Sequence, residues 1–160
     1  MKPAMENRDP ALCRAFVKRA RELFQDNPRA KHSWSVDADE DHCILDIPEQ
    51  AAEGFSVTVQ AFADEIILSA GGAHCHFDAK AGIESCVETV LGLVRDLLSP
   101  QMRVRELRSN NRPYRWYIEV WNGEQWLAEE EYGYFFWNYF GRKAERHYQN
   151  HVLKSRLISD

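Results

Sequence analysis

"FSVTVQAFADEIILSAGGAHCHF", residues 55–77, decides the fold because it holds three alternating runs separated by two short links. In each run an apolar residue recurs at every second position, which is typical of strands with one buried face. The links Ala63-Asp64 and Gly71-Gly72 have the length and composition of two-residue hairpin loops. We therefore expect an antiparallel meander. Its buried face is expected to carry Phe55, Val57, Val59, Ala61, Ile66, Leu68, Ala70, Ala73, Cys75 and Phe77.

The segment before this meander predicts one helix and two more strands. Asp9-Pro10 is a helix start, since an acidic N-cap precedes a proline in the first helical position. The residues that follow at helical spacing are Leu12, Phe16, Ala20 and Leu23. The runs 32–36 and 43–47 are short strands joined by an acidic loop.

The segment after the meander predicts a second helix over 81–100, with a broad apolar face and a proline at its end. Alternating runs at 102–108, 114–121 and 124–132 predict three further strands. The Asn122-Gly123 pair between the last two indicates a hairpin.

Two loop lengths fit this last hairpin. A two-residue loop would pair Ile118 with Leu127. We prefer a loop one residue longer because it gathers the apolar residues on one face. That face would then hold Trp116, Ile118, Val120, Trp126 and Ala128. Independently of the loop length, we expect an exposed strand face on which arginines pair with nearby glutamates, for instance Arg115 across from Glu130.

The chain is predicted to end in a helix over 141–157, with Ala144, Tyr148 and Val152 facing inward. The expected fold class is therefore α+β, with antiparallel sheet pairing and the order α-βββββ-α-βββ-α. We expect a single domain over 1–160, of which residues 1–8 are flexible.

Composition and charge narrow the classes of function. The net charge is −5, but residues 1–100 hold 10 Lys and Arg against 17 Asp and Glu, whereas residues 101–160 hold 10 against 8. An acidic total argues against general nucleic-acid binding, although five arginines between 103 and 115 keep a local alternative open. No secretory signal, membrane span or CxxC pair is found, so we expect a cytoplasmic protein with reduced cysteines and no membrane contact.

Two histidine pairs and one acidic loop are the candidate metal ligands. His74 and His76 share one face of a strand, and His147 and His151 would share one face of the predicted C-terminal helix. No acid accompanies either pair in a recognised motif, so we predict neither a metal site nor a cofactor. The segment 37–48 resembles an EF-hand calcium loop at its start, with Asp37, Asp39 and Asp41 at alternating positions, but His42 and Pro48 stand where that loop needs glycine and glutamate.

Catalytic motifs are absent from the sequence. It contains no GxSxG, no recognised cysteine-protease signature and no phosphate-binding glycine loop, so a non-catalytic protein is favoured.

The aromatic segment "YGYFFWNYFGRK", residues 132–143, supplies the candidate binding residues instead. Thirteen of the 19 aromatic residues fall between Tyr114 and Tyr148. Such a run packs the core, meets a partner or ligand, or contacts a membrane, and the last is disfavoured because the run lacks the length and the basic helical face of an anchor. Our candidates are Tyr134, Trp137, Tyr139, Arg142 and His147.

In element order and acidic charge the chain is similar to the small acidic secretion chaperones, although it has extra strands and a mildly basic end. Those chaperones bind an extended client segment as dimers, so the resemblance implies a protein partner and a homodimer. Small adaptor and immunity-type proteins have the same general features. The alternative function is an enzyme or small-ligand-binding protein with a pocket lined by the aromatic segment.

Overall fold

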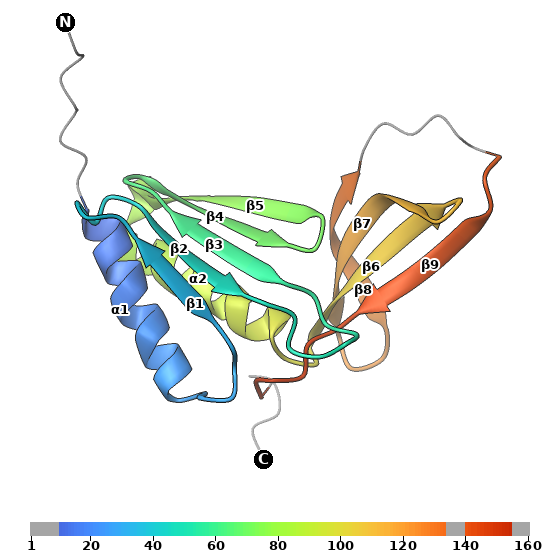
Figure 1. The fold of residues 1–160 in the computed structure, drawn as a ribbon, viewed down its shortest axis with the longest axis horizontal. Helices are drawn as coiled ribbons and strands as arrows, with labels where there is room; N and C mark the ends of the chain where they lie inside the picture. Colours follow the sequence, from blue (N-terminus) through green and yellow to red (C-terminus); the bar gives the residue numbers. More distant parts are fainter. Residues whose placement is uncertain (1–9, 134–139, 155–160) are drawn as a thin grey trace, which may run out of the picture.

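The computed structural model describes residues 10–133 and 140–154, which form an α+β fold with two antiparallel sheets and two α-helices (Figure 1). The helices are α1 (Ala11–Gln25) and α2 (Ile83–Leu97), and a short 3-10 turn η1 (Ala79–Ala81) precedes α2. The predicted flexible segment 1–8 and the predicted N-cap Asp9 lie outside the described residues.

The first sheet has the order β1-β2-β3-β4-β5, and both helices lie on one of its faces (Figure 1). Its strands are β1 (Ser33–Val36), β2 (Cys43–Ile47), β3 (Val57–Ala61), β4 (Glu65–Ala70) and β5 (Ala73–Asp78). The predicted meander is confirmed, because Val59 pairs with Leu68, and Ala70 pairs with Ala73 across a two-residue turn.

The main core lies between this sheet and the two helices. In α1 the predicted stripe Leu12, Phe16, Ala20 and Leu23 is buried. It meets the buried strand positions Leu45, Val57, Val59, Ile66 and Leu68 and the α2 positions Val87, Val90 and Val94. Burial of one large apolar side chain stabilises the folded state by about 1.5–3 kcal/mol. The helical and strand periodicities of the sequence therefore place the side chains that stabilise this core.

The second sheet has the order β8-β7-β6-β9. Its strands are β6 (Met102–Ser109), β7 (Arg112–Trp121), β8 (Trp126–Gly133) and β9 (Lys143–Tyr148). Its inner face, with buried Val104, Trp116 and Ile118, meets the end of the β4–β5 hairpin (Figure 1). A Cβ on Gly72 would lie 2.4 Å from the Trp116 ring, so this contact requires glycine.

The predicted C-terminal helix is wrong, because residues 143–148 form strand β9 instead. β9 covers an edge of β6 that would otherwise be unpaired, with Val104 opposite Tyr148 and Ser109 opposite Lys143. Ala144, predicted to face inward, is exposed. The order of elements is therefore α-βββββ-α-ββββ among the described residues, and the closing helix of the secretion-chaperone order is not found there.

After β9 the chain returns to the first sheet and helix α2. The Gln149 N–H donates to the carbonyl oxygen of Glu53 at 2.8 Å, and the Val152 N–H donates to that of Leu98 at 2.9 Å. The buried Asn150 amide donates to the carbonyl oxygens of Phe55 (3.1 Å) and Leu97 (3.3 Å). Residues 149–153 thus tie the second sheet to the end of α2.

Both predicted loop lengths for the last hairpin are wrong. Trp121 pairs with Trp126, so the loop has four residues, and the Asn122 side chain accepts hydrogen bonds from the Glu124 and Gln125 backbone N–H groups at 2.9 and 2.8 Å. A bulge then shifts the register, so that Ile118 pairs with Glu130 and Arg115 with Gly133. Arg115 forms its ion pair with Glu131, at 3.2 Å.

Candidate functional site

The outer edge of β1 exposes backbone hydrogen-bonding groups. The Asp37 N–H donates to the His42 carbonyl oxygen at 3.0 Å, which makes Asp37 and His42 a hydrogen-bonded pair of the β1–β2 ladder. Because such pairs alternate in an antiparallel ladder, Ser35 and Ser33 also direct their backbone groups to β2, whereas Trp34 and Val36 direct theirs away. In the described part of the chain no strand pairs with this outer edge.

A groove of about 560 Å³ lies between this edge and helix α1. Val17 on α1 and Val36 on β1 provide its apolar surface, and the Val36 side chain is 40% exposed. The other lining residues are Cys13, Arg14, Lys18, Arg21, Glu22, Gln25 and Glu40. The groove therefore offers an apolar strip beside an unpaired strand edge.

Charge in the groove is unevenly compensated. Arg14 pairs with Glu40, and Glu22 pairs with Arg19 on the same helix. Lys18 and Arg21 form no ion pair among the described residues, and the Arg21 guanidinium lies 6.0 Å from the centre of the Trp34 ring. The groove thus leaves two cations for a ligand, although the whole chain is acidic.

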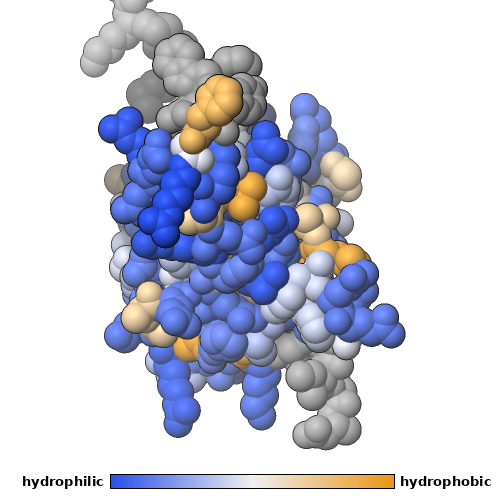
Figure 2. All heavy atoms as spheres, turned by 90° about the vertical axis from the view of Figure 1, so that its right-hand side faces the viewer, coloured by the Kyte–Doolittle hydropathy of each residue, from blue (hydrophilic) through white to orange (hydrophobic). Residues whose placement is uncertain are grey.

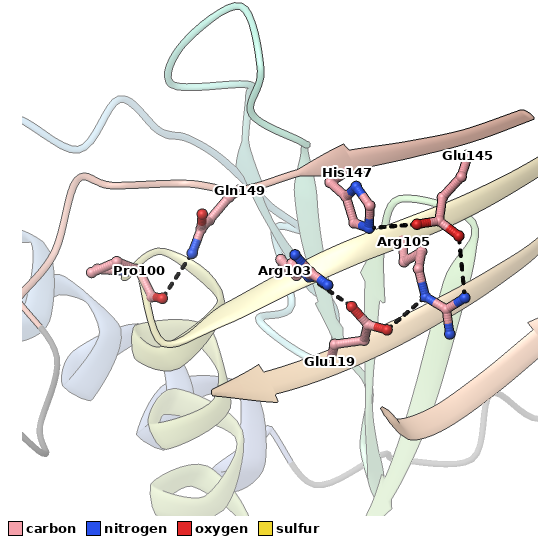
Figure 3. A network of polar contacts seen from close by, with 7 residues as sticks. All are labelled: Pro100, Arg103, Arg105, Glu119, Glu145, His147 and Gln149. Carbon is pink, nitrogen blue, oxygen red and sulfur yellow. Dashed lines mark hydrogen bonds and ion pairs between the residues drawn. The ribbon is translucent and has the colours of Figure 1, made fainter. Parts of the chain in front are cut away.

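The outer face of the second sheet is polar (Figure 2). There Glu119, only 4% exposed, accepts hydrogen bonds from Arg103 and Arg105, each at 2.6 Å (Figure 3). Each arginine also lies over an aromatic ring at 4.3 Å, Arg103 over Trp126 and Arg105 over Tyr117. These guanidinium groups are already paired with protein groups, which favours the structural explanation of the arginine-rich segment over nucleic-acid binding.

Of the five predicted binding residues, only Arg142 and His147 lie in the described part of the chain. Tyr134, Trp137 and Tyr139 lie outside the described residues. Arg142 is exposed, and its backbone exchanges two hydrogen bonds of 2.9 Å with Asn110. His147 lies on β9, where its Nε2 is 3.0 Å from the Glu145 carboxylate, next to Arg105 (Figure 3).

The two histidine pairs also remain separate. His74 and His76 lie on β5, with ring centres 5.6 Å apart, and His76 contacts Glu65 at 3.1 Å. His147 and His151 do not share a helix face, because β9 ends at Tyr148 and His151 follows outside any helix or strand. Within residues 10–133 and 140–154, no group of three or more His, Cys, Asp or Glu could hold a metal ion.

The four cysteines are thiols rather than disulfides, and three of them are buried. Burial raises the pKa of Cys13, Cys43 and Cys86, so these groups stay protonated at neutral pH. Cys13 borders the groove. Cys75 is half-buried, with its Sγ 3.1 Å from the Tyr132 hydroxyl oxygen.

Comparison of the chain with protein-family models, curated proteins and solved structures gives no match. No helix in the described ranges is long and apolar enough to cross a membrane.

The sequence did not indicate the groove, because Val17 lies beside the predicted helical stripe and Val36 was assigned only to a short strand. One usable signal was present: a strand without Lys or Pro, next to a helix with three cations on the adjoining face. Glu106 was not among the predicted site residues either, although it is the one acidic residue at the inward positions Met102, Val104 and Glu106 of its strand.

Proposed function

We propose that this protein is a non-catalytic binding protein, of the chaperone or adaptor kind, that takes an extended segment of a partner protein along β1. The observation that carries the proposal is the unpaired outer edge of β1, within the described part of the chain, beside the groove on α1. A peptide strand would accept and donate hydrogen bonds at Trp34 and Val36, as in strand addition to an exposed sheet edge.

The chemistry of the partner follows from the groove. Alternate side chains of an added strand point to the same face, so every second residue of the segment would lie against Val17 and Val36. Lys18 and Arg21 favour acidic residues at the flanks of this apolar contact. The preferred segment is therefore extended, apolar at alternate positions and acidic. A location in a reducing compartment such as the cytoplasm fits the four reduced thiols.

Peptide-display selection on the full chain tests this function. Selected peptides are expected to alternate apolar residues with acidic ones. Val36→Pro removes the outward N–H but leaves the β1–β2 hydrogen bonds in place, and it should weaken binding of a selected peptide by about tenfold or more. Val36→Thr is the matched control, because it keeps both the N–H and the branched shape.

Three results would contradict the proposal. One is a selection in which no peptide of this pattern is enriched. Another is equal peptide affinity for the wild type and a folded Val36→Pro variant. The third is a dimer of the free chain in light scattering that becomes a monomer in Val36→Pro, because the edge would then be occupied by a second copy.

A further inference from the structure

A second cavity, of about 310 Å³, lies between the two sheets and is independent of the groove. Its lining comes from the β2–β3 connection, the turn of the β4–β5 hairpin and the inner face of the second sheet. The lining residues are Glu49, Gly54, Phe55, Ser56, Gly71, Gly72, Val104, Glu106, Trp116 and Tyr148. This volume is at the lower end of the range for small-ligand sites, so it fits a small molecule.

The Glu106 carboxylate is held in a fixed position in this cavity. It is 8% exposed, and Oε2 accepts a hydrogen bond from the Trp116 indole N–H at 3.0 Å. Oε1 accepts hydrogen bonds from Arg108 at 2.8 Å and, more weakly, from the Tyr148 hydroxyl at 3.4 Å. A carboxylate has about four acceptor sites, so these three bonds leave room for one more donor.

The charge of the lining selects the sign of a ligand. Glu49 and Glu106 contribute two carboxylates, and the lining contains no Lys, Arg or His among the described residues. Arg108 offsets part of the charge of Glu106, but it is not a lining residue. A cation is therefore favoured in the cavity, and an anion would face two carboxylates.

Aromatic rings complete the site. Trp116, Tyr148 and Phe55 line the cavity, and ring faces attract ammonium groups, most strongly when water is excluded. The absence of a side chain at Gly72 lets the hairpin turn approach the Trp116 ring and close this side of the cavity. A carboxylate beside two or three rings is a suitable environment for an organic ammonium ion.

From these contacts we propose that the cavity binds a small organic ammonium ligand, with its charged nitrogen near Glu106 and its carbon substituents against Trp116 and Tyr148. Glu49, which is exposed at the same cavity, adds a second negative charge. No covalent step is involved.

Titration of the full chain with simple probes, followed by NMR, tests the proposal. The reporter is the Trp116 indole N–H signal, assigned with Trp116→Phe, because this proton is donated to Glu106. Tetramethylammonium and propylammonium chloride should shift the signal in a saturable way. The comparison probes are tert-butanol and sodium propionate, which match their size, and sodium chloride at equal ionic strength. None of the comparison probes should give a saturable shift.

Two variants locate the site. Glu106→Gln keeps the shape but removes the charge, and it should weaken binding of the ammonium probes by about tenfold or more. Glu49→Gln should weaken binding less, because its carboxylate is exposed. Glu53→Gln is the matched control, since this nearby glutamate does not line the cavity, and it should bind as the wild type does.

The proposal is overturned if neither ammonium probe gives a saturable shift, or if tert-butanol or sodium chloride gives the same one. It is also overturned if Glu106→Gln is folded by circular dichroism and binds tetramethylammonium like the wild type. Should Glu106→Gln fail to fold, Glu49→Gln replaces it. Unchanged affinity in that variant then counts against the site.

Discussion

Replacement of Gly72 by alanine tests the contact between the two sheets. The added Cβ would lie 2.4 Å from Cδ2 and Cε2 of Trp116 and 2.8 Å from Cε3. Carbon atoms in favourable contact are about 3.5–4.0 Å apart, so the turn or the indole must move by roughly 1 Å. Trp116 is buried and tied to Glu106 by a 3.0 Å hydrogen bond, so it has little freedom to yield.

The expected cost follows from these two contacts. Overpacking of this kind lowers the free energy of unfolding by about 1–3 kcal/mol. Displacement of the indole would also weaken its hydrogen bond to Glu106, at a further cost of about 1 kcal/mol. We therefore expect Gly72→Ala to lower the free energy of unfolding by about 2–4 kcal/mol, and the melting temperature by about 5–15 °C for a chain of this size.

Urea unfolding followed by tryptophan fluorescence measures this effect, and Gly123→Ala is the matched control. Gly123 has a positive φ of 99°, and a Cβ added there would meet no described atom within 4 Å, so its replacement carries only a backbone cost of about 1 kcal/mol. A Gly72→Ala variant as stable as the wild type, or no less stable than Gly123→Ala, would refute the close packing between the sheets.

Three further predictions concern thiols, the outer polar network and the return of the chain. At pH 8, Cys75→Ser should remove the fast phase of thiol titration with a disulfide reagent, because burial raises the pKa of the other three thiols. The reaction of those three thiols should become faster only as the pH rises. A fast phase that persists in the variant would contradict this prediction. Glu119→Gln should lower the free energy of unfolding, measured in urea, by about 1–3 kcal/mol, since two partly exposed arginines lose their shared carboxylate. An ordinary surface substitution changes it by less than about 0.5 kcal/mol, and so small a change here would argue against the network. Asn150→Ala should cost about 2–3 kcal/mol in the same assay, because two buried carbonyl groups lose their donor, and an unchanged unfolding midpoint would refute the role of Asn150 in joining the layers.

The first sheet and its helices were predictable because the apolar residues of each element follow a single spacing, every second residue in a strand and every third or fourth in a helix. Val57, Val59, Leu68 and Ala70 alternate with polar residues, and the hairpin turns between them have the minimum length, so only one register buries the apolar set. The α1 stripe was equally clear, since Leu12, Phe16 and Ala20 all end up buried.

The C-terminal strand was not predictable from local pattern. Half of residues 143–148 are charged, several are good helix formers, and Tyr148 fits both a helical and an alternating spacing. The deciding interaction is non-local, because the open edge of β6 lies about 40 residues earlier in the chain and offers a full ladder to β9.

The candidate sites were hidden for a related reason. A groove beside Val36 exists only because β1 is an edge strand, and strand order within a sheet is not encoded by alternation. Glu106 meets Trp116 across the β6–β7 pair, and Tyr148 approaches from a strand that was predicted to be a helix. Trp116 and Tyr148, which line the cavity, lie outside the predicted set of binding residues.

The return of the chain after β9 also determines where the protein can be cut and rejoined. Leu98 and Val152 are hydrogen-bonded at 2.9 Å, and the Gln149 side chain donates to the Pro100 carbonyl oxygen at 2.7 Å (Figure 3). The chain therefore enters the second sheet and returns from it at one place, next to the end of α2. An engineer could join Ser99 to Asn150 through a short turn and exchange the intervening residues as a cassette, with the helices and the β1 groove left in place.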